Sequence, residues 1–207
     1  MTDLEVFRIP SGMLRELVGF GRRQPIKSLS SLVDDRSSLS KYFGVYFIYY
    51  RGHSELYKPI SELNFKSFVH PIYIGKAVSG GARTGSGNSG HLYGRLSEHK
   101  RSILSTANLD PKDFYYQVIA MEVDLVAWAE SALIRYYQPV WNSLISGFGI
   151  HAPGAGRLKQ ERSIWDQLHP GRGFSMNLPV HRPVDAYHIQ SQVREHTVKY
   201  NIKPDNF

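Results

Sequence analysis

Two nearby stretches of the chain combine aromatic with β-branched side chains, residues 42–50 (YFGVYFIYY) and 65–75 (FKSFVHPIYIG). Runs of this kind are typical of β-strands, and their order predicts an antiparallel hairpin. The residues between them, from Arg51 on, are polar, include a proline and are too many for a tight turn. We therefore expect a loop insertion between the two strands.

Apolar residues recur at helical spacing farther along the chain, over residues 92–104. Leu92, Leu96 and Ile103 can face a core together. Arg95 and His99 are four positions apart, so both side chains emerge from one face of the predicted helix.

Residues 114–123 (FYYQVIAMEV) predict a third strand, followed by a helix that Asp124 can cap and Pro139 ends. Inside that helix, small and apolar neighbours turn Glu130 towards a packed or cleft-lining surface. The order is strand, strand, helix, strand, helix. It predicts an α+β fold, with a small three-stranded antiparallel sheet flanked by helices.

The predicted core spans residues 42–146, with elaborations over 1–41 and 147–207. Neither flank has the Cys/His spacing of a zinc finger, and no internal repeat is present. The glycine-rich residues 79–94 lack the Gly-Lys-Ser/Thr ending of a nucleotide-binding loop.

Composition narrows the function. Hydrophobic residues make up 42% of the chain and aromatic residues 13%, which favours a folded protein over a disordered one. The absence of cysteine excludes disulfides, thiolate zinc sites and a cysteine nucleophile. A net charge of +7 favours a polyanionic partner such as nucleic acid. With no apolar run of about 20 residues, we expect a soluble cytoplasmic protein that does not enter a membrane.

A set of short signals in fixed order makes the function more specific: Gly44-Val45-Tyr46, Tyr73-Ile74-Gly75, Arg95 with His99, Glu130 and Asn142. This set resembles the GIY-YIG nuclease family, with Val45 in place of the usual isoleucine. The resemblance extends over about residues 42–142, half of the chain, and implies the same three-stranded α+β fold.

The resemblance also implies roles for these residues. Tyr46 would accept a proton from the attacking water, His99 would relay it, and Arg95 would lower the tyrosine pKa and stabilise phosphoryl oxygens. Tyr73 would position the scissile phosphate or support the sheet, and Asn142 would hydrogen-bond backbone or phosphate. Glu130, the only acidic residue of the set, implies one Mg²⁺ ion, for which Mn²⁺ can substitute. Further DNA contacts are expected at three basic residues, Lys76, Arg83 and Arg101. We also expect the flank 1–41 to contact DNA or form a dimer, and the flank 147–207 to contact DNA.

Within the family, the chain most resembles the type II restriction enzymes of bacteria, since its flanks leave no room for a separate DNA-binding domain. We expect cleavage of double-stranded DNA by a homodimer on a short palindrome, and a companion methyltransferase in the cell. Three alternatives stay open: a structure-specific or repair nuclease of the family, a non-catalytic nucleic-acid-binding protein with this fold, and an ordinary α+β domain.

Overall fold

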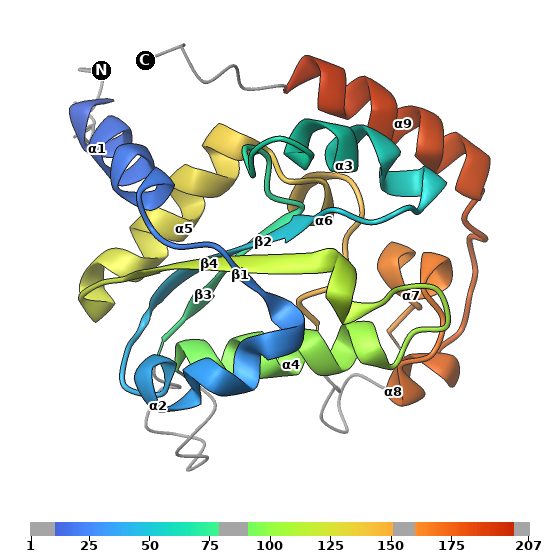
Figure 1. The fold of residues 1–207 in the computed structure, drawn as a ribbon. Helices are drawn as coiled ribbons and strands as arrows, with labels where there is room; N and C mark the ends of the chain where they lie inside the picture. The colour runs from blue at the N-terminus through green and yellow to red at the C-terminus, as the bar shows by residue number, and fades with distance from the viewer. Residues whose placement is uncertain (1–10, 79–90, 151–159, 201–207) are drawn as a thin grey trace, which may run out of the picture.

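The computed structural model describes residues 11–78, 91–150 and 160–200. At its centre lies one antiparallel sheet in the order β1-β4-β2-β3 (Figure 1). The strands are β1 Lys27–Ser28, β2 Gly44–Tyr50, β3 Tyr73–Ala77 and β4 Phe114–Ala120. The prediction of a three-stranded antiparallel sheet describes β2, β3 and β4, with β2 and β3 forming the expected antiparallel pair.

The fourth strand, β1, comes from the N-terminal flank and was not predicted. It pairs Lys27 with Tyr116 and Ser28 with Tyr115 on the outer side of β4. Two residues are too few to show an alternating pattern, so this strand has no signature in the sequence.

Residues 51–72 differ from the predicted loop and strand. They contain the 3-10 helix η2 Glu55–Tyr57 and the helix α3 Lys58–Asn64, and the next strand begins only at Tyr73. The buried side chain of Asn64 explains the late start. Its amide nitrogen donates to the carbonyls of Tyr50 and His70, while its oxygen accepts from the backbone N–H groups of Val69 and His70. These bonds fold the segment back against the end of β2 before β3 can form.

Two long helices follow the predictions closely. The first is α4 Leu92–Leu104, and the second is α5 Val123–Tyr137. Asp124 lies in the first turn of α5, but the N-cap residue is Glu122, so the predicted cap is two positions too late. Gln138 ends α5 in the left-handed conformation, directly before Pro139.

The remaining helices surround the sheet (Figure 1). They are α1 Ser11–Arg22, η1 Leu29–Asp35, α2 Arg36–Leu39, η3 Pro111–Asp113, α6 Val140–Ser143, α7 Ile164–Leu168, α8 Gly173–Met176 and α9 Ala186–Lys199. Among the described residues, no helix is both long and apolar enough to cross a membrane.

The central strand β2 is buried on both faces, which accounts for its unbroken aromatic and aliphatic run. Val45, Phe47 and Tyr49 pack with residues of α1 and α5. Tyr46 and Ile48 face the opposite side, where the core includes residues of α4 and of the C-terminal flank. Alternation along β2 therefore points Tyr46 towards α4.

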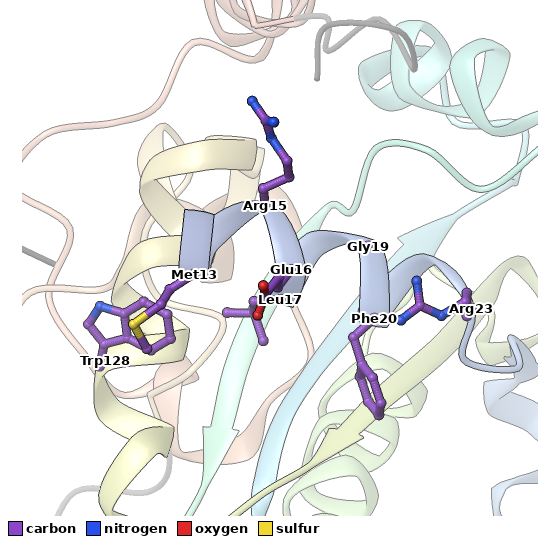
Figure 2. A pocket seen from close by; sticks show the side chains of 8 residues that line it. All are labelled: Met13, Arg15, Glu16, Leu17, Gly19, Phe20, Arg23 and Trp128. Atoms are coloured by element: carbon purple, nitrogen blue, oxygen red, sulfur yellow. The ribbon is translucent and has the colours of Figure 1, made fainter. Parts of the chain in front are cut away.

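A pocket beside α1 is lined by Met13 and Phe20 among other residues of that helix, by Arg23 directly after it, and by Trp128 of α5 (Figure 2). None of its lining residues belongs to the set singled out from the sequence.

Candidate active site

Two glycines allow Tyr46 to take its place. Gly44, at the start of β2, has a φ of +153°, and a Cβ there would lie 2.0 Å from the carbonyl oxygen of Ile119. Gly75 is the β3 partner of Tyr46. A Cβ at Gly75 would lie 2.4 Å from the Tyr46 hydroxyl. Only glycine at this position therefore leaves room for the phenol group.

The Tyr46 hydroxyl lies 2.7 Å from Nε2 of His99, and both side chains are fully buried. The contact joins β2 to α4 across 53 positions of sequence. It brings together the two residues that the family resemblance implies pass a proton from one to the other.

Burial raises the pKa of the Tyr46 hydroxyl well above its ordinary value of 10.0, and the nearby Tyr73 raises it further. Arg95 lowers this pKa through its charge and a hydrogen bond, as expected, but its effect is smaller than that of burial. The pKa of Tyr46 is nevertheless raised in total, because desolvation of a phenolate outweighs one nearby guanidinium. At neutral pH Tyr46 is a neutral phenol that can donate to His99.

Tyr73 lies beside Tyr46 and His99. Its ring meets His99 edge to face, with 5.1 Å between ring centroids. Burial is the largest cause that raises the pKa of Tyr73, to about 12, while Arg95 lowers it. Tyr73 is therefore also a neutral hydrogen-bonding group.

Arg95 is half-buried on α4, and its Nη1 lies 2.5 Å from Oε2 of Glu98. Glu98 is not among the residues singled out from the sequence. Its carboxylate orients the guanidinium, which keeps Arg95 next to the two tyrosines.

Glu130 of α5 faces Lys76 of β3, and Oε2 of the carboxylate lies 2.7 Å from Nζ of the lysine. The side chain of Glu130 is 17% exposed, so it remains partly accessible. Glu130 also raises the pKa of Tyr46, which places it within electrostatic reach of the Tyr46–His99 pair.

A single accessible carboxylate suits a hard divalent cation that takes its other ligands from water and phosphate. In the described part of the chain, no three His, Asp or Glu side chains gather around one point. Mg²⁺ commonly binds through one or two carboxylates plus substrate phosphates rather than in a cage of protein ligands. The residues therefore fit one such ion, with Glu130 as its protein ligand.

Asn142 of α6 does not point to the open side of the site. Its Oδ1 accepts from the N–H of Ile74 and its Nδ2 donates to the carbonyl of Ile74, both at 2.8 Å. This side chain holds β3 between Tyr73 and Gly75. Of the two contacts expected for Asn142, the structure shows the one to backbone.

The three basic residues expected to contact DNA have different outcomes. Lys76 pairs with Glu130 as described. Arg101 is exposed on α4, one turn from Glu98. Arg83 lies outside the described residues.

Sequence reasoning missed Phe148. This residue is fully buried and its ring stacks on that of His99, with centroids 4.5 Å apart and planes inclined by 21°. The neighbouring Gly149 lies against Tyr73, where a Cβ would come within 2.6 Å of the hydroxyl. Both residues follow the predicted core, and no motif marks them.

The family model described as the Eco29kI GIY-YIG domain matches residues 38–197, well over half of the chain. The match includes all six residues of the predicted site and continues through α7, α8 and most of α9. No curated protein matches the sequence.

Proposed function

Because the chain belongs to the family of the Eco29kI GIY-YIG domain and is thus a GIY-YIG nuclease, we propose that it is a type II site-specific endonuclease of double-stranded DNA. The observation that carries the proposal is the buried 2.7 Å contact between the Tyr46 hydroxyl and His99, with Arg95 and Glu130 within electrostatic reach. This arrangement offers a proton acceptor, a cation for the phosphate and a carboxylate for a metal ion.

In the proposed reaction, Tyr46 and His99 together carry one proton away from the attacking water. A water molecule at the phosphorus loses a proton to the Tyr46 oxygen as the phenol proton passes to Nε2 of His99. The hydroxide forms a P–O bond as the bond to the leaving 3′ oxygen breaks, and that oxygen takes up a proton from solvent water. The raised pKa of Tyr46 favours this coupled transfer over a preformed phenolate, since the phenol is neutral before the water arrives.

The remaining residues act on charge and position. Arg95, held by Glu98, stabilises the negative phosphoryl oxygens in the transition state. Tyr73 donates a hydrogen bond to the scissile phosphate. Glu130 would hold a divalent cation, which would supply positive charge to the phosphoryl group and to the leaving oxygen.

Lys76 and Glu130 form an ion pair, with 2.7 Å between Nζ and Oε2. We propose that the lysine leaves the carboxylate when a phosphate and its cation enter, and then neutralises that phosphate. The pair would keep Glu130 from standing as an uncompensated charge before the substrate binds.

We also propose Mg²⁺ as the cation, with Mn²⁺ as a substitute, and a homodimer on a palindromic site in which each subunit cuts one strand. A methyltransferase of the same specificity would protect the genome of the cell. Arg101, exposed on α4, would contact the DNA backbone.

Plasmid cleavage tests the proposed activity. The protein is incubated with a long plasmid of diverse sequence in Mg²⁺ or in EDTA, and the product ends are sequenced. We expect discrete fragments, only with metal, whose ends share one symmetric sequence. Cutting only at branched structures would favour a repair nuclease, and salt-sensitive binding without cleavage would favour a non-catalytic protein.

The variant Glu130→Gln tests the assigned metal ligand in the same assay. We expect cleavage to fall below detection while DNA affinity is kept, because the substitution removes a ligand charge and no phosphate contact. Glu122→Gln is the matched control, since it makes the same change at an exposed position at the start of the same helix. Equal activity in the two variants would remove Glu130 from the proposed site.

A further inference from the structure

A buried ion pair lies behind the site, in the C-terminal flank. Arg172 and Asp166 are 3% and 2% exposed. Nε and Nη2 of the arginine each donate to one carboxylate oxygen, both at 2.7 Å. Ser163 donates to the same carboxylate at 2.6 Å. A buried pair of this geometry fixes the direction of the guanidinium.

The other N–H groups of Arg172 all point at one turn, residues 147–150. Nη2 donates to the carbonyl of Gly147 at 2.9 Å, and Nη1 donates to those of Phe148 at 3.2 Å and Ile150 at 2.8 Å. With the two bonds to Asp166, this accounts for all five donors of a guanidinium. A lysine, with three donors on one nitrogen, cannot reproduce the pattern.

The turn carries the ring that touches the proposed proton relay. Phe148 stacks on His99 with centroids 4.5 Å apart, and meets Tyr73 edge to face at 5.0 Å. Trp141 supports the other side of Phe148, with centroids 4.4 Å apart. The His99 ring is therefore held between Phe148 and the tyrosines of the site.

We propose that Arg172 and Asp166 form a clamp that positions His99 through the turn 147–150 and Phe148. The clamp keeps the imidazole plane at the angle that directs Nε2 to the Tyr46 hydroxyl. Arg172, Asp166 and Phe148 are positioning residues, because none of them reaches the reacting atoms. The inference rests on the proposed function only for its effect on cleavage.

The variant Arg172→Lys tests the clamp, because it keeps the positive charge next to Asp166 and removes the bonds to the turn. The matched control is Arg162→Lys. Arg162 also donates to backbone carbonyls of the C-terminal flank, those of Ser175, Met176 and Leu178, but these lie outside the turn 147–150.

The first measurement is the NMR spectrum of histidine ring C–H groups in the full-length protein, with His99 assigned from the variant His99→Asn. A ring stacked over His99 shifts its proton resonances upfield. We expect Arg172→Lys to reduce this shift and leave the resonance of His70, a second buried histidine, in place. Arg162→Lys should leave both resonances unchanged.

The second measurement is the single-turnover cleavage rate on a duplex containing the site found with the plasmid. We expect Arg172→Lys to slow cleavage roughly 10- to 100-fold, the scale of a small misplacement of a catalytic group, with DNA affinity in Ca²⁺ within about twofold of wild type. A loss of affinity equal to the loss of rate would indicate a merely structural role.

The variant Phe148→Leu keeps the clamp and most of the packed volume but removes the ring. We expect it to abolish the upfield shift of His99 and to slow cleavage as much as Arg172→Lys does. This variant tests the contact between Phe148 and His99 even if Arg172→Lys fails to fold. An unchanged His99 resonance in Arg172→Lys, or an equal change in Arg162→Lys, would overturn the clamp. Full activity of His99→Asn would instead overturn the proposed relay, and the NMR result would still stand.

Discussion

The hydroxyl of Tyr46 is buried and neutral, and it forms a 2.7 Å hydrogen bond with His99. A free tyrosine is a poor base at neutral pH, and burial makes the phenolate still less accessible. The short contact to an imidazole resolves this difficulty, because the proton can leave the phenol for His99 as another arrives from water. Tyr46 and His99 are therefore proposed to accept the proton of the attacking water as a pair, which neither residue could do alone.

Removal of this hydroxyl should affect rate and not binding. We expect Tyr46→Phe to lower the single-turnover cleavage rate by about 100-fold or more, as for loss of a general acid–base group, with DNA affinity within roughly twofold. Tyr49→Phe is the control, because Tyr49 is buried on the opposite face of β2, where its hydroxyl donates to Gln117 at 3.0 Å. Near-normal turnover of Tyr46→Phe would exclude the proposed role.

Lys76 should compete with a cation for Glu130. We expect Lys76→Met to tighten Mn²⁺ binding in DNA-free protein by roughly fivefold, which corresponds to the ~1 kcal/mol of a partly exposed ion pair. Electron paramagnetic resonance of free Mn²⁺ measures this affinity. Lys58→Met removes a lysine that lies 3.9 Å from Glu55 at the surface, and it should leave Mn²⁺ binding unchanged. Unaltered affinity in Lys76→Met would show that the lysine does not compete.

At the scale of elements, β3 is held in place by a side chain rather than by a further strand. Its backbone pairs with β2 on one side, and the amide of Asn142 bonds to Ile74 on the other. At Ile74, the Asn142 side chain of the short helix α6 thus makes the two backbone hydrogen bonds that a neighbouring strand would otherwise make. Tyr73 and Lys76 lie on either side of this point, so their positions depend on it.

Loss of the two hydrogen bonds between Asn142 and Ile74 should lower the free energy of unfolding. We expect Asn142→Ala to lower it by about 2–4 kcal/mol, because both backbone groups of the buried Ile74 lose their partner. Ser143→Ala, the neighbouring change, removes a 3.2 Å surface bond to Gln138 and should cost at most about 0.5 kcal/mol. Urea denaturation of both variants measures the difference, and equal costs would contradict the bridging role.

At the scale of the whole molecule, two buried histidines make stability depend on pH. Burial lowers the pKa of His70 to about 4 and that of His169 to about 3. His169 is a neutral member of a network with Tyr57 and Asn108. Neither ring nitrogen of His70 has a hydrogen-bond partner among the described residues.

The difference in proton binding between the folded and unfolded states sets the direction in which stability changes with pH. Between the lowered folded pKa values and the unfolded value of about 6.5, the unfolded chain binds more protons, so stability falls as pH is lowered. We expect each histidine to cost up to about 2 kcal/mol of unfolding free energy at pH 5 relative to pH 7.5.

Urea denaturation at the two pH values measures this loss. His70→Leu should reduce the difference, while His188→Gln, a change at an exposed histidine, should keep it. An equal pH dependence in wild type and His70→Leu would assign the effect to other groups.

The C-terminal flank packs against the site in one buried cluster. Trp165 of α7 lies in the same buried cluster as Tyr46, Ile48 and Phe148. Two of the residues that hold the turn behind His99, Asp166 and Arg172, come from this flank. The family match over residues 38–197 extends through the same region.

The sequence by itself determined the three main strands, α4, α5 and the six motif residues, because periodicity, glycine spacing and helix ends are local properties of the chain. Only the tertiary structure decided the burial that keeps Tyr46 neutral, the pairing of Lys76 with Glu130, the edge strand β1 and the contact of Phe148 with His99. These features join residues far apart in sequence, such as His99 and Phe148. Their energies depend on desolvation and on packing across elements, which no local pattern encodes.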